Sequence, residues 1–78
     1  MTNQKNVKFS DFVILLKAFG FNLDRSEGSH NIFKNISISE RINAQNKNGE
    51  AKPYQICQFL GLIEKYDLKL DEEETENA

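Results

Sequence analysis

Two segments with the apolar spacing of an amphipathic helix, one early and one late in the chain, enclose a stretch in which apolar and polar residues alternate. Each helical segment has one apolar face, because its apolar residues fall at i, i+3, i+4 and i+7. These residues are Phe12, Leu15, Leu16 and Phe19 in the first segment and Ile56, Phe59, Leu60 and Ile63 in the second. Two helices that each need an apolar surface, joined by short strands, favour a two-layer α+β domain. One face of the sheet then carries both helices, and the other is left to solvent or a partner.

Local signals set the expected ends of the two helices. The first is predicted over residues 11–19, with Ser10 as its N-cap and Gly20 as its C-terminal stop. The second is predicted from Pro53, a residue type favoured at the first helical position, to about Tyr66.

Three runs between these helices are predicted to be strands, at residues 21–24, 30–35 and 41–45. Gly28 lies in the turn before the second run and can adopt a positive φ there at little steric cost. Residues 46–49 turn the chain before the last helix. The predicted order is therefore α-β-β-β-α, with a three-stranded antiparallel sheet and two helices on one of its faces.

Length and composition narrow the classes of protein that fit this pattern. A chain of 78 residues allows one small domain. One Cys cannot form an internal disulfide, which predicts a reducing, cytoplasmic compartment. One Cys and one His fall short of the ligands of a zinc site, so we expect no metal and no cofactor. The longest apolar run, residues 12–16, is far below the roughly 18 residues of a membrane span, and the start lacks a signal-peptide pattern.

The net charge of −2 is unevenly placed along the chain. Five acidic residues lie within residues 71–78, which leaves 10 Lys and Arg against 7 Asp and Glu over residues 1–70, a net charge of +3. We expect a single domain over residues 1–70, with residues 1–8 as a loose arm, and a disordered acidic tail over residues 71–78. An alternative is that the tail mimics a polyanion and folds back on a basic surface. A mildly basic domain permits RNA binding without demonstrating it.

His30 is the single histidine and starts the second predicted strand directly after a turn. An imidazole takes up and releases protons near neutral pH, which suits general acid-base catalysis. A lone histidine is also commonly a surface or structural residue. Residues 30, 32 and 34 share one strand face and residues 31, 33 and 35 the other, and the sequence leaves open which face is buried. If His30 faces outward, Lys34 places a cation on the same face; if it faces inward, it is a core histidine.

Lys52 immediately precedes the last predicted helix. A cation is unfavourable at the positive end of a helix, so this placement suggests a bound anion such as phosphate, with Lys47 from the preceding turn as a second cation. The alternative is an ordinary solvated lysine. Arg25 and Arg41 add positive charge on other strands, where such residues commonly have no role beyond solubility.

The overall pattern resembles the HicA family of bacterial toxins over roughly residues 8–68. The residues that carry the resemblance are Phe19-Gly20-Phe21, Arg25, Gly28-Ser29-His30-Asn31-Ile32-Phe33, Gln45, Gly49 and Lys52-Pro53-Tyr54-Gln55. The resemblance implies a double-stranded-RNA-binding-domain-like fold. It also implies an mRNA interferase, an endoribonuclease that is neutralised by a HicB-type antitoxin. Two features depart from the family pattern: the polar loop around residues 36–40 and the acidic tail.

The resemblance also implies roles for individual residues. The essential histidine of the family falls on His30, and the glycine and serine of its supporting turn fall on Gly28 and Ser29. His30 would act as general base or acid when a ribose 2′-OH attacks the adjacent phosphate, a reaction that needs no metal. The candidates for phosphate binding are cations chosen on physical grounds: Lys34, Lys52, Arg25 and Lys47.

The expected partners are an mRNA substrate and a HicB-type antitoxin, with no membrane and no DNA contact by this chain alone. A non-catalytic RNA-binding module of the same fold and a protein-interaction subunit are the alternatives. Lys52 at the helix start favours the two RNA-binding hypotheses, and His30 favours the enzyme.

Overall fold

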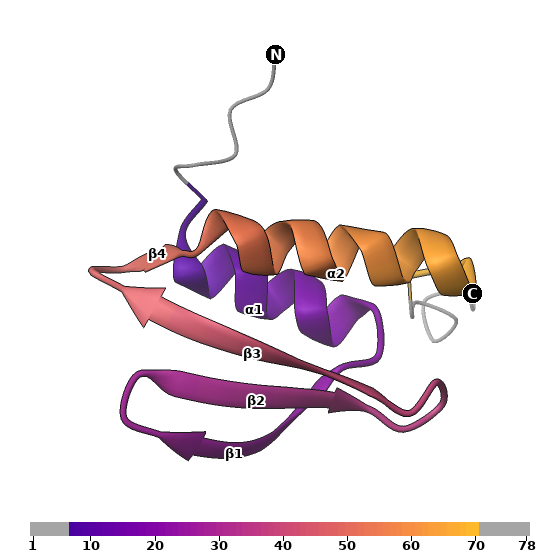
Figure 1. The fold of residues 1–78 in the computed structure, drawn as a ribbon, viewed down its shortest axis with the longest axis horizontal. Coiled ribbons are helices and arrows are strands. Elements are labelled where there is room, and N and C mark those ends of the chain that lie inside the picture. The colour runs from indigo at the N-terminus through magenta and orange to yellow at the C-terminus, as the bar shows by residue number, and fades with distance from the viewer. Residues whose placement is uncertain (1–6, 71–78) are drawn as a thin grey trace, which may run out of the picture.

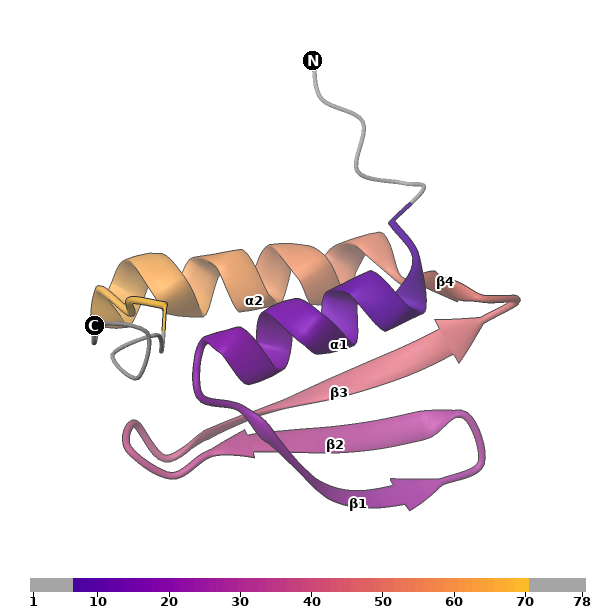
Figure 2. The ribbon, with the colours of Figure 1, turned by 180° about the vertical axis from the view of Figure 1, so that it is seen from behind.

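The computed structural model describes residues 7–70 as a four-stranded antiparallel sheet with two helices on one face (Figures 1 and 2). The strands are adjacent in the order β1-β2-β3-β4. The elements are α1 (Phe9–Ala18), β1 (Asn22–Glu27), β2 (His30–Asn35), β3 (Glu40–Lys47), β4 (Glu50–Ala51) and α2 (Pro53–Tyr66). The α+β prediction with both helices on one sheet face is confirmed, and the layout is consistent with a double-stranded-RNA-binding-domain-like fold. No helix within residues 7–70 is long and apolar enough to cross a membrane.

The prediction of three strands is wrong by one, because β4 is only two residues long. It follows a two-residue turn in which Asn48 (φ 53°) and Gly49 (φ 86°) both have positive φ, as in a type I′ hairpin. Two residues cannot show an alternating pattern, so no periodic signal marks this strand in the sequence.

The segment just before α1 lies beside β4. The backbone N–H of Ala51 donates to the carbonyl of Val7 (2.9 Å), that of Phe9 donates to Gly49 (2.9 Å), and Lys8 forms an antiparallel bridge with Glu50. Residues 7 and 8, which we expected in a loose arm, therefore extend the edge of the sheet. Residues 1–6 of that arm and the acidic tail of residues 71–78 lie outside the described residues.

These bonds also explain why α1 begins two residues earlier than predicted. The N-cap is Lys8, which makes no side-chain capping bond, and Ser10 is inside the helix. Gly20 ends the helix as expected: it has φ 91°, and the N–H of Phe21 donates to the carbonyl of Leu16 (2.9 Å). α2 begins at Pro53 and ends at Tyr66, as predicted.

The core lies between the helices and the sheet and is centred on Phe59 of α2, which is 1% exposed. Its ring packs edge-to-face against three other phenylalanines, with centroid distances of 5.7 Å to Phe12, 5.7 Å to Phe19 and 5.9 Å to Phe21. The sheet contributes Phe33, Ile42 and Ala44 from beneath. One α2 side chain thus joins α1, the segment after it and the sheet in one cluster.

We expect Phe59→Ala to lower the free energy of unfolding by about 3–5 kcal/mol, because it leaves a cavity where three aromatic edges meet. Urea denaturation measures the loss. The neighbouring Leu60, 44% exposed, is the matched control, and Leu60→Ala should cost no more than about 1 kcal/mol. Equal losses for the two variants would contradict this account of the core, and Phe59→Leu keeps the comparison measurable if Phe59→Ala does not fold.

The end of α2 is tied to the start of β3 by one side-chain hydrogen bond. The Tyr66 hydroxyl donates to Oε2 of Glu40 at 2.7 Å. This hydrogen bond is the main reason that the pKa of Tyr66 lies above its ordinary value of 10.0, and partial burial and the charge of Glu40 act in the same direction. Because the protonated form is favoured in the fold, the stabilisation is complete at neutral pH and is lost as pH rises through the raised pKa.

Glu40→Gln should therefore lower the pKa of Tyr66, since it removes the carboxylate that holds the phenol proton. Absorbance titration near 295 nm measures the change, with Tyr54→Phe as the common background so that Tyr66 alone contributes. An unchanged titration midpoint would show that the bond does not persist in solution.

Candidate functional site

His30 lies on the exposed face of the sheet, opposite the helices. Phe33 (3% exposed) and Asn35 (4% exposed) are buried beneath the helix layer, and Nδ2 of Asn35 donates to the carbonyl of Phe19 at 3.1 Å. Because side chains alternate along a strand, His30, Ile32 and Lys34 point the other way. The question that the sequence left open is settled: the His30 side chain is exposed.

A two-residue turn, Gly28-Ser29, joins β1 to β2 and immediately precedes His30. Gly28 has φ 61° and Ser29 has no positive φ, the pattern of a type II′ hairpin. A Cβ built on Gly28 would meet nothing within 4 Å, so the backbone conformation alone favours glycine here. The turn sets the register in which Glu27 lies directly opposite His30.

A groove of about 330 Å³ surrounds His30 and is lined by Arg25, Glu27, His30, Ile32 and Asn43. Arg25 was predicted from sequence, and the structure brings it beside His30. A bulge between Leu23 and Arg25 makes this possible, because Leu23 pairs with Phe33 while Arg25 pairs with Ile32. Without the extra residue, Arg25 would share the face of Leu23 and point toward the helices.

Asn43 of β3 holds one side of the His30 ring. Its amide lies against Nδ1 of His30, with Nδ2 at 3.0 Å and Oδ1 at 3.3 Å. An amide can donate to Nδ1 or accept from Nδ1–H, so either tautomer is accommodated according to the orientation of the amide. This contact leaves Nε2 as the ring nitrogen available for chemistry.

Sequence reasoning missed Asn43 and Glu27 as neighbours of His30. Both lie on other strands, and their proximity depends on the β1–β2 and β2–β3 registers. For Glu27 a signal was present: it precedes a two-residue Gly-Ser turn and His30 follows it, which pairs the two residues in a tight hairpin. For Asn43 the connection of residues 36–39 is too irregular to give the register.

Lys34 lies on the same face as His30 but toward the other end of β2. It pairs with Arg41, and both line a second groove, of about 430 Å³, with Ile36, Ser39 and Glu40. Lys34 follows His30 by four positions along the strand, a distance of about 13 Å at about 3.3 Å per residue. Lys34 therefore lies along the sheet from the histidine and outside its groove.

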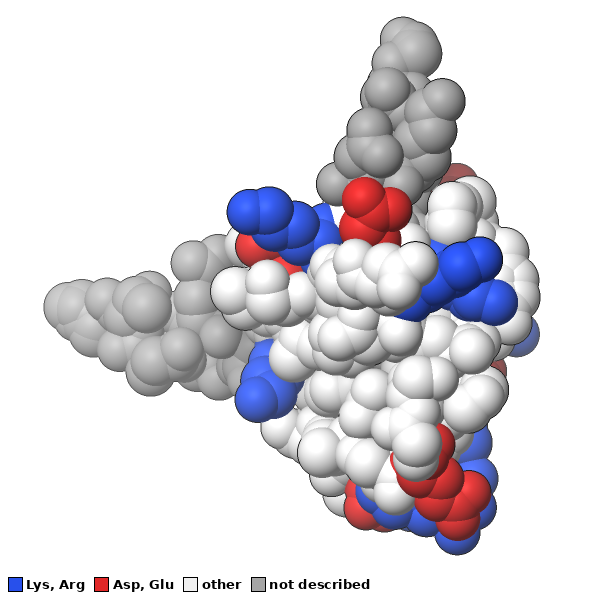
Figure 3. Space-filling view, turned by 90° about the vertical axis from the view of Figure 1, so that its left-hand side faces the viewer, with Lys and Arg blue, Asp and Glu red and all other residues white. Residues whose placement is uncertain are grey.

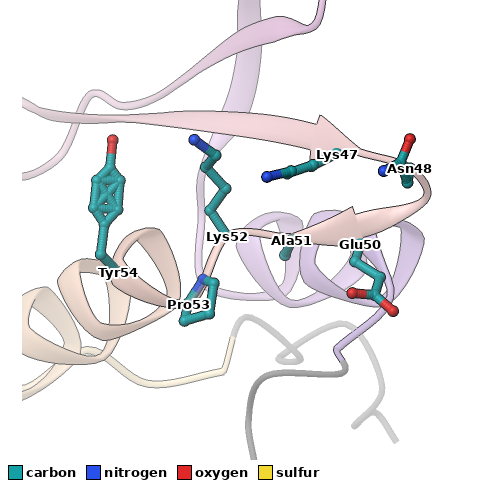
Figure 4. Close-up of a pocket in the computed structure, with 7 residues that line it drawn as sticks. All are labelled: Lys47, Asn48, Glu50, Ala51, Lys52, Pro53 and Tyr54. Carbon is teal, nitrogen blue, oxygen red and sulfur yellow. The ribbon is translucent and has the colours of Figure 1, made fainter.

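Lys47 and Lys52 both line a third groove, of about 920 Å³, between the β3–β4 hairpin and the start of α2. The Lys47, Lys52 and Tyr54 side chains extend to the same side of the β4 backbone, and Glu50 points away (Figure 4). Lys52 is the N-cap of α2, and the first turn of α2 contains no acidic residue. The positive helix end and two ammonium groups thus lie together.

The buried Gln55 side chain fixes the wall of this third groove. It is 1% exposed, its Oε1 accepts from the backbone N–H of Gln45 at 2.8 Å, and its Nε2 donates to Oε1 of Gln45 at 3.2 Å. These bonds hold the first turn of α2 against β3.

The family model described as HicA toxin of bacterial toxin-antitoxin matches residues 9–63. The chain belongs to the HicA toxin family. The match runs from the start of α1 into α2 and contains His30, its turn and all four candidate phosphate-binding residues. A HicA protein is the toxin of a bacterial toxin-antitoxin system, so this toxin has an antitoxin as partner. Comparison with curated proteins and with solved structures finds no significant match.

On the face of the toxin that Figure 3 shows, the charged side chains do not gather in one patch. Figure 3 shows basic side chains in separate groups with uncharged surface between them. Among residues 7–70, no group of three or more His, Cys, Asp or Glu side chains is placed to hold a metal ion. The His30 groove offers an imidazole, a carboxylate, a guanidinium and an amide.

Proposed function

We propose that this HicA toxin is a metal-independent mRNA interferase, an endoribonuclease whose catalytic residue is His30. The observation that carries the proposal is the exposed imidazole, held at Nδ1 by Asn43 in a groove that also contains Arg25. A HicB-type antitoxin would neutralise the toxin. Family membership supports the toxin role and the existence of an antitoxin, and the geometry of the groove supports the reaction class.

The proposed reaction is attack of a ribose 2′-OH on the adjacent phosphate. Nε2 of His30 takes up or delivers a proton in this step, while the Asn43 amide keeps the ring oriented. Negative charge builds on the nonbridging phosphate oxygens, and the Arg25 guanidinium lines the same groove. A guanidinium can donate two parallel hydrogen bonds to such oxygens, which stabilises that charge. The nucleophile comes from the RNA itself.

The cations outside the His30 groove would position the RNA strand. Lys34 and Arg41 lie farther along the exposed sheet face, and Lys47 and Lys52 form a separate groove at the start of α2. Contacts at several separated cations would fix the register of a flexible strand over His30, which is how phosphate contacts act in nucleic-acid binding. Gly28 and Ser29 support the site through the turn that pairs Glu27 with His30.

His30→Ala should reduce RNA cleavage in EDTA by 10²-fold or more, since a positioned acid or base contributes about 10²–10⁴-fold. RNA affinity and the circular dichroism spectrum should stay close to those of the wild type, because the side chain is exposed. Gln58→Ala, at an exposed position on α2, is the matched control and should leave the rate unchanged. Equal cleavage by wild type and His30→Ala would remove His30 from the mechanism.

The same assay tests the non-catalytic alternative, an RNA-binding module whose separated cationic grooves would suffice for binding. The wild-type toxin is purified free of antitoxin and contaminating nuclease for this test. If it then binds RNA and leaves the RNA intact, the non-catalytic alternative is established.

Lys52→Ala should weaken RNA binding and flatten its salt dependence, because each phosphate contact to a single strand contributes about 0.7 to the slope of log K against log salt. Binding isotherms of a 2′-O-methyl RNA, which cannot be cleaved, at several salt concentrations measure the slope. Lys17→Ala is the control, since Lys17 is exposed in the last turn of α1, away from this groove. Equal slopes for wild type and Lys52→Ala would remove Lys52 from the RNA contacts.

A further inference from the structure

Glu27 is the residue paired with His30 across the β1–β2 hairpin, and it lines the same groove. We propose that Glu27 is a second catalytic residue, with its carboxylate as the general base of RNA cleavage and His30 as the general acid. This inference rests on the proposed ribonuclease activity and divides its two proton transfers between two side chains.

The backbone fixes the Glu27–His30 pair closely. The two residues flank the two-residue turn, so the shortest type of hairpin connection joins them. Directly opposed residues in an antiparallel pair have Cβ atoms about 4.5–5.5 Å apart and point to the same face. Both residues are exposed, and they share the sheet face opposite the one that buries Phe33. The carboxylate and the imidazole therefore project into one groove from neighbouring strands.

The chemistry of the two side chains fits this division of roles. A carboxylate only accepts hydrogen bonds, which suits it to receive the 2′-OH proton. Nδ1 of His30 lies 3.0 Å from Nδ2 and 3.3 Å from Oδ1 of the Asn43 amide. With the amide turned so that Oδ1 faces the ring, Oδ1 accepts from Nδ1–H while Nε2–H is delivered to the leaving group. Arg25 lies two residues before Glu27 on the same strand face, about 6–7 Å along β1. The groove thus holds a proton acceptor, a proton donor and a cation for the phosphate.

The step balances within these groups and the RNA. The 2′-O–H proton passes to the Glu27 carboxylate as the 2′-O–P bond forms. The P–O5′ bond breaks, and the proton on Nε2 of His30 passes to O5′. The products are a 2′,3′-cyclic phosphate and a 5′-hydroxyl, with a neutral Glu27 and a neutral His30 that exchange their protons with water.

Other carboxylates in the described chain are placed elsewhere. Glu40 accepts the hydrogen bond of Tyr66, and Glu50 lies on β4 at the edge of the groove of Lys47 and Lys52, with its side chain pointing away from theirs (Figure 4). Glu27 is the acidic side chain in the His30 groove. Within residues 7–70, the carboxylate of Glu27 takes part in no ion pair and in no side-chain hydrogen bond, so it is free to accept a proton.

The negative charge of Glu27 allows a role in catalysis to be distinguished from a role in RNA binding. A carboxylate repels phosphates, so its neutralisation should leave RNA affinity unchanged or increase it. A catalytic base predicts the opposite effect on rate. Glu27→Gln, which keeps the size and removes the charge, should therefore cleave RNA at least 10²-fold more slowly while it binds 2′-O-methyl RNA as tightly as the wild type or more tightly.

The experiment measures single-turnover cleavage of RNA in EDTA by purified full-length toxin, together with binding of the 2′-O-methyl RNA. Glu64→Gln, at an exposed position on α2, is the matched control and should match the wild type in both assays. The Glu27→Gln/His30→Ala double variant should lose little more than His30→Ala, because the two groups act in one step.

Each outcome separates this inference from the proposed function. A wild-type toxin that leaves RNA intact would overturn the proposed ribonuclease activity itself. An active wild type with Glu27→Gln cleaving within threefold of it would overturn the role of Glu27 alone. Loss of cleavage that is matched by an equal loss of RNA affinity would also overturn it, because Glu27 would then serve binding or folding.

Discussion

The packing of Phe59 against three phenylalanine edges is the contact on which the rest of the molecule depends. It fixes α2 to α1 and to the segment that leads into β1, and both helices then cover the sheet face that carries Phe33, Ile42 and Ala44. Because strand side chains alternate, burial of Phe33 forces His30 to the opposite face. The exposure of the candidate catalytic histidine is thus a consequence of core packing three residues away.

The exposed face shows how a very small domain can assemble a site without a cavity enclosed by loops. Its groups come from three neighbouring strands and are placed by register: Glu27 opposite His30, Arg25 turned outward by a bulge, and Asn43 against the ring. Tight turns and ladder hydrogen bonds hold such groups more rigidly than a long loop would. The geometry of the candidate site is therefore largely set by the fold itself.

The sequence predicted the parts of this fold that rest on local signals. α2 begins at Pro53, and β2 spans residues 30–35, as expected, because proline placement and alternation act within a few residues. The parts that it missed depend on contacts between distant segments. The N-terminus of α1 is set by hydrogen bonds from residues 7–9 to β4, and β4 itself is too short for a pattern. Arg25 was chosen for its charge, but its place beside His30 needs a bulge that composition does not reveal.

That bulge has a second consequence, for the solubility of the toxin. β1 is an edge strand of the sheet, and an unpaired edge is a template on which another chain can add a strand. A bulge and charged side chains on an edge both oppose such addition, and β1 has the bulge together with Asp24, Arg25 and Glu27. β1, which contributes Arg25 and Glu27 to the His30 groove, thus also protects the toxin from edge-to-edge aggregation.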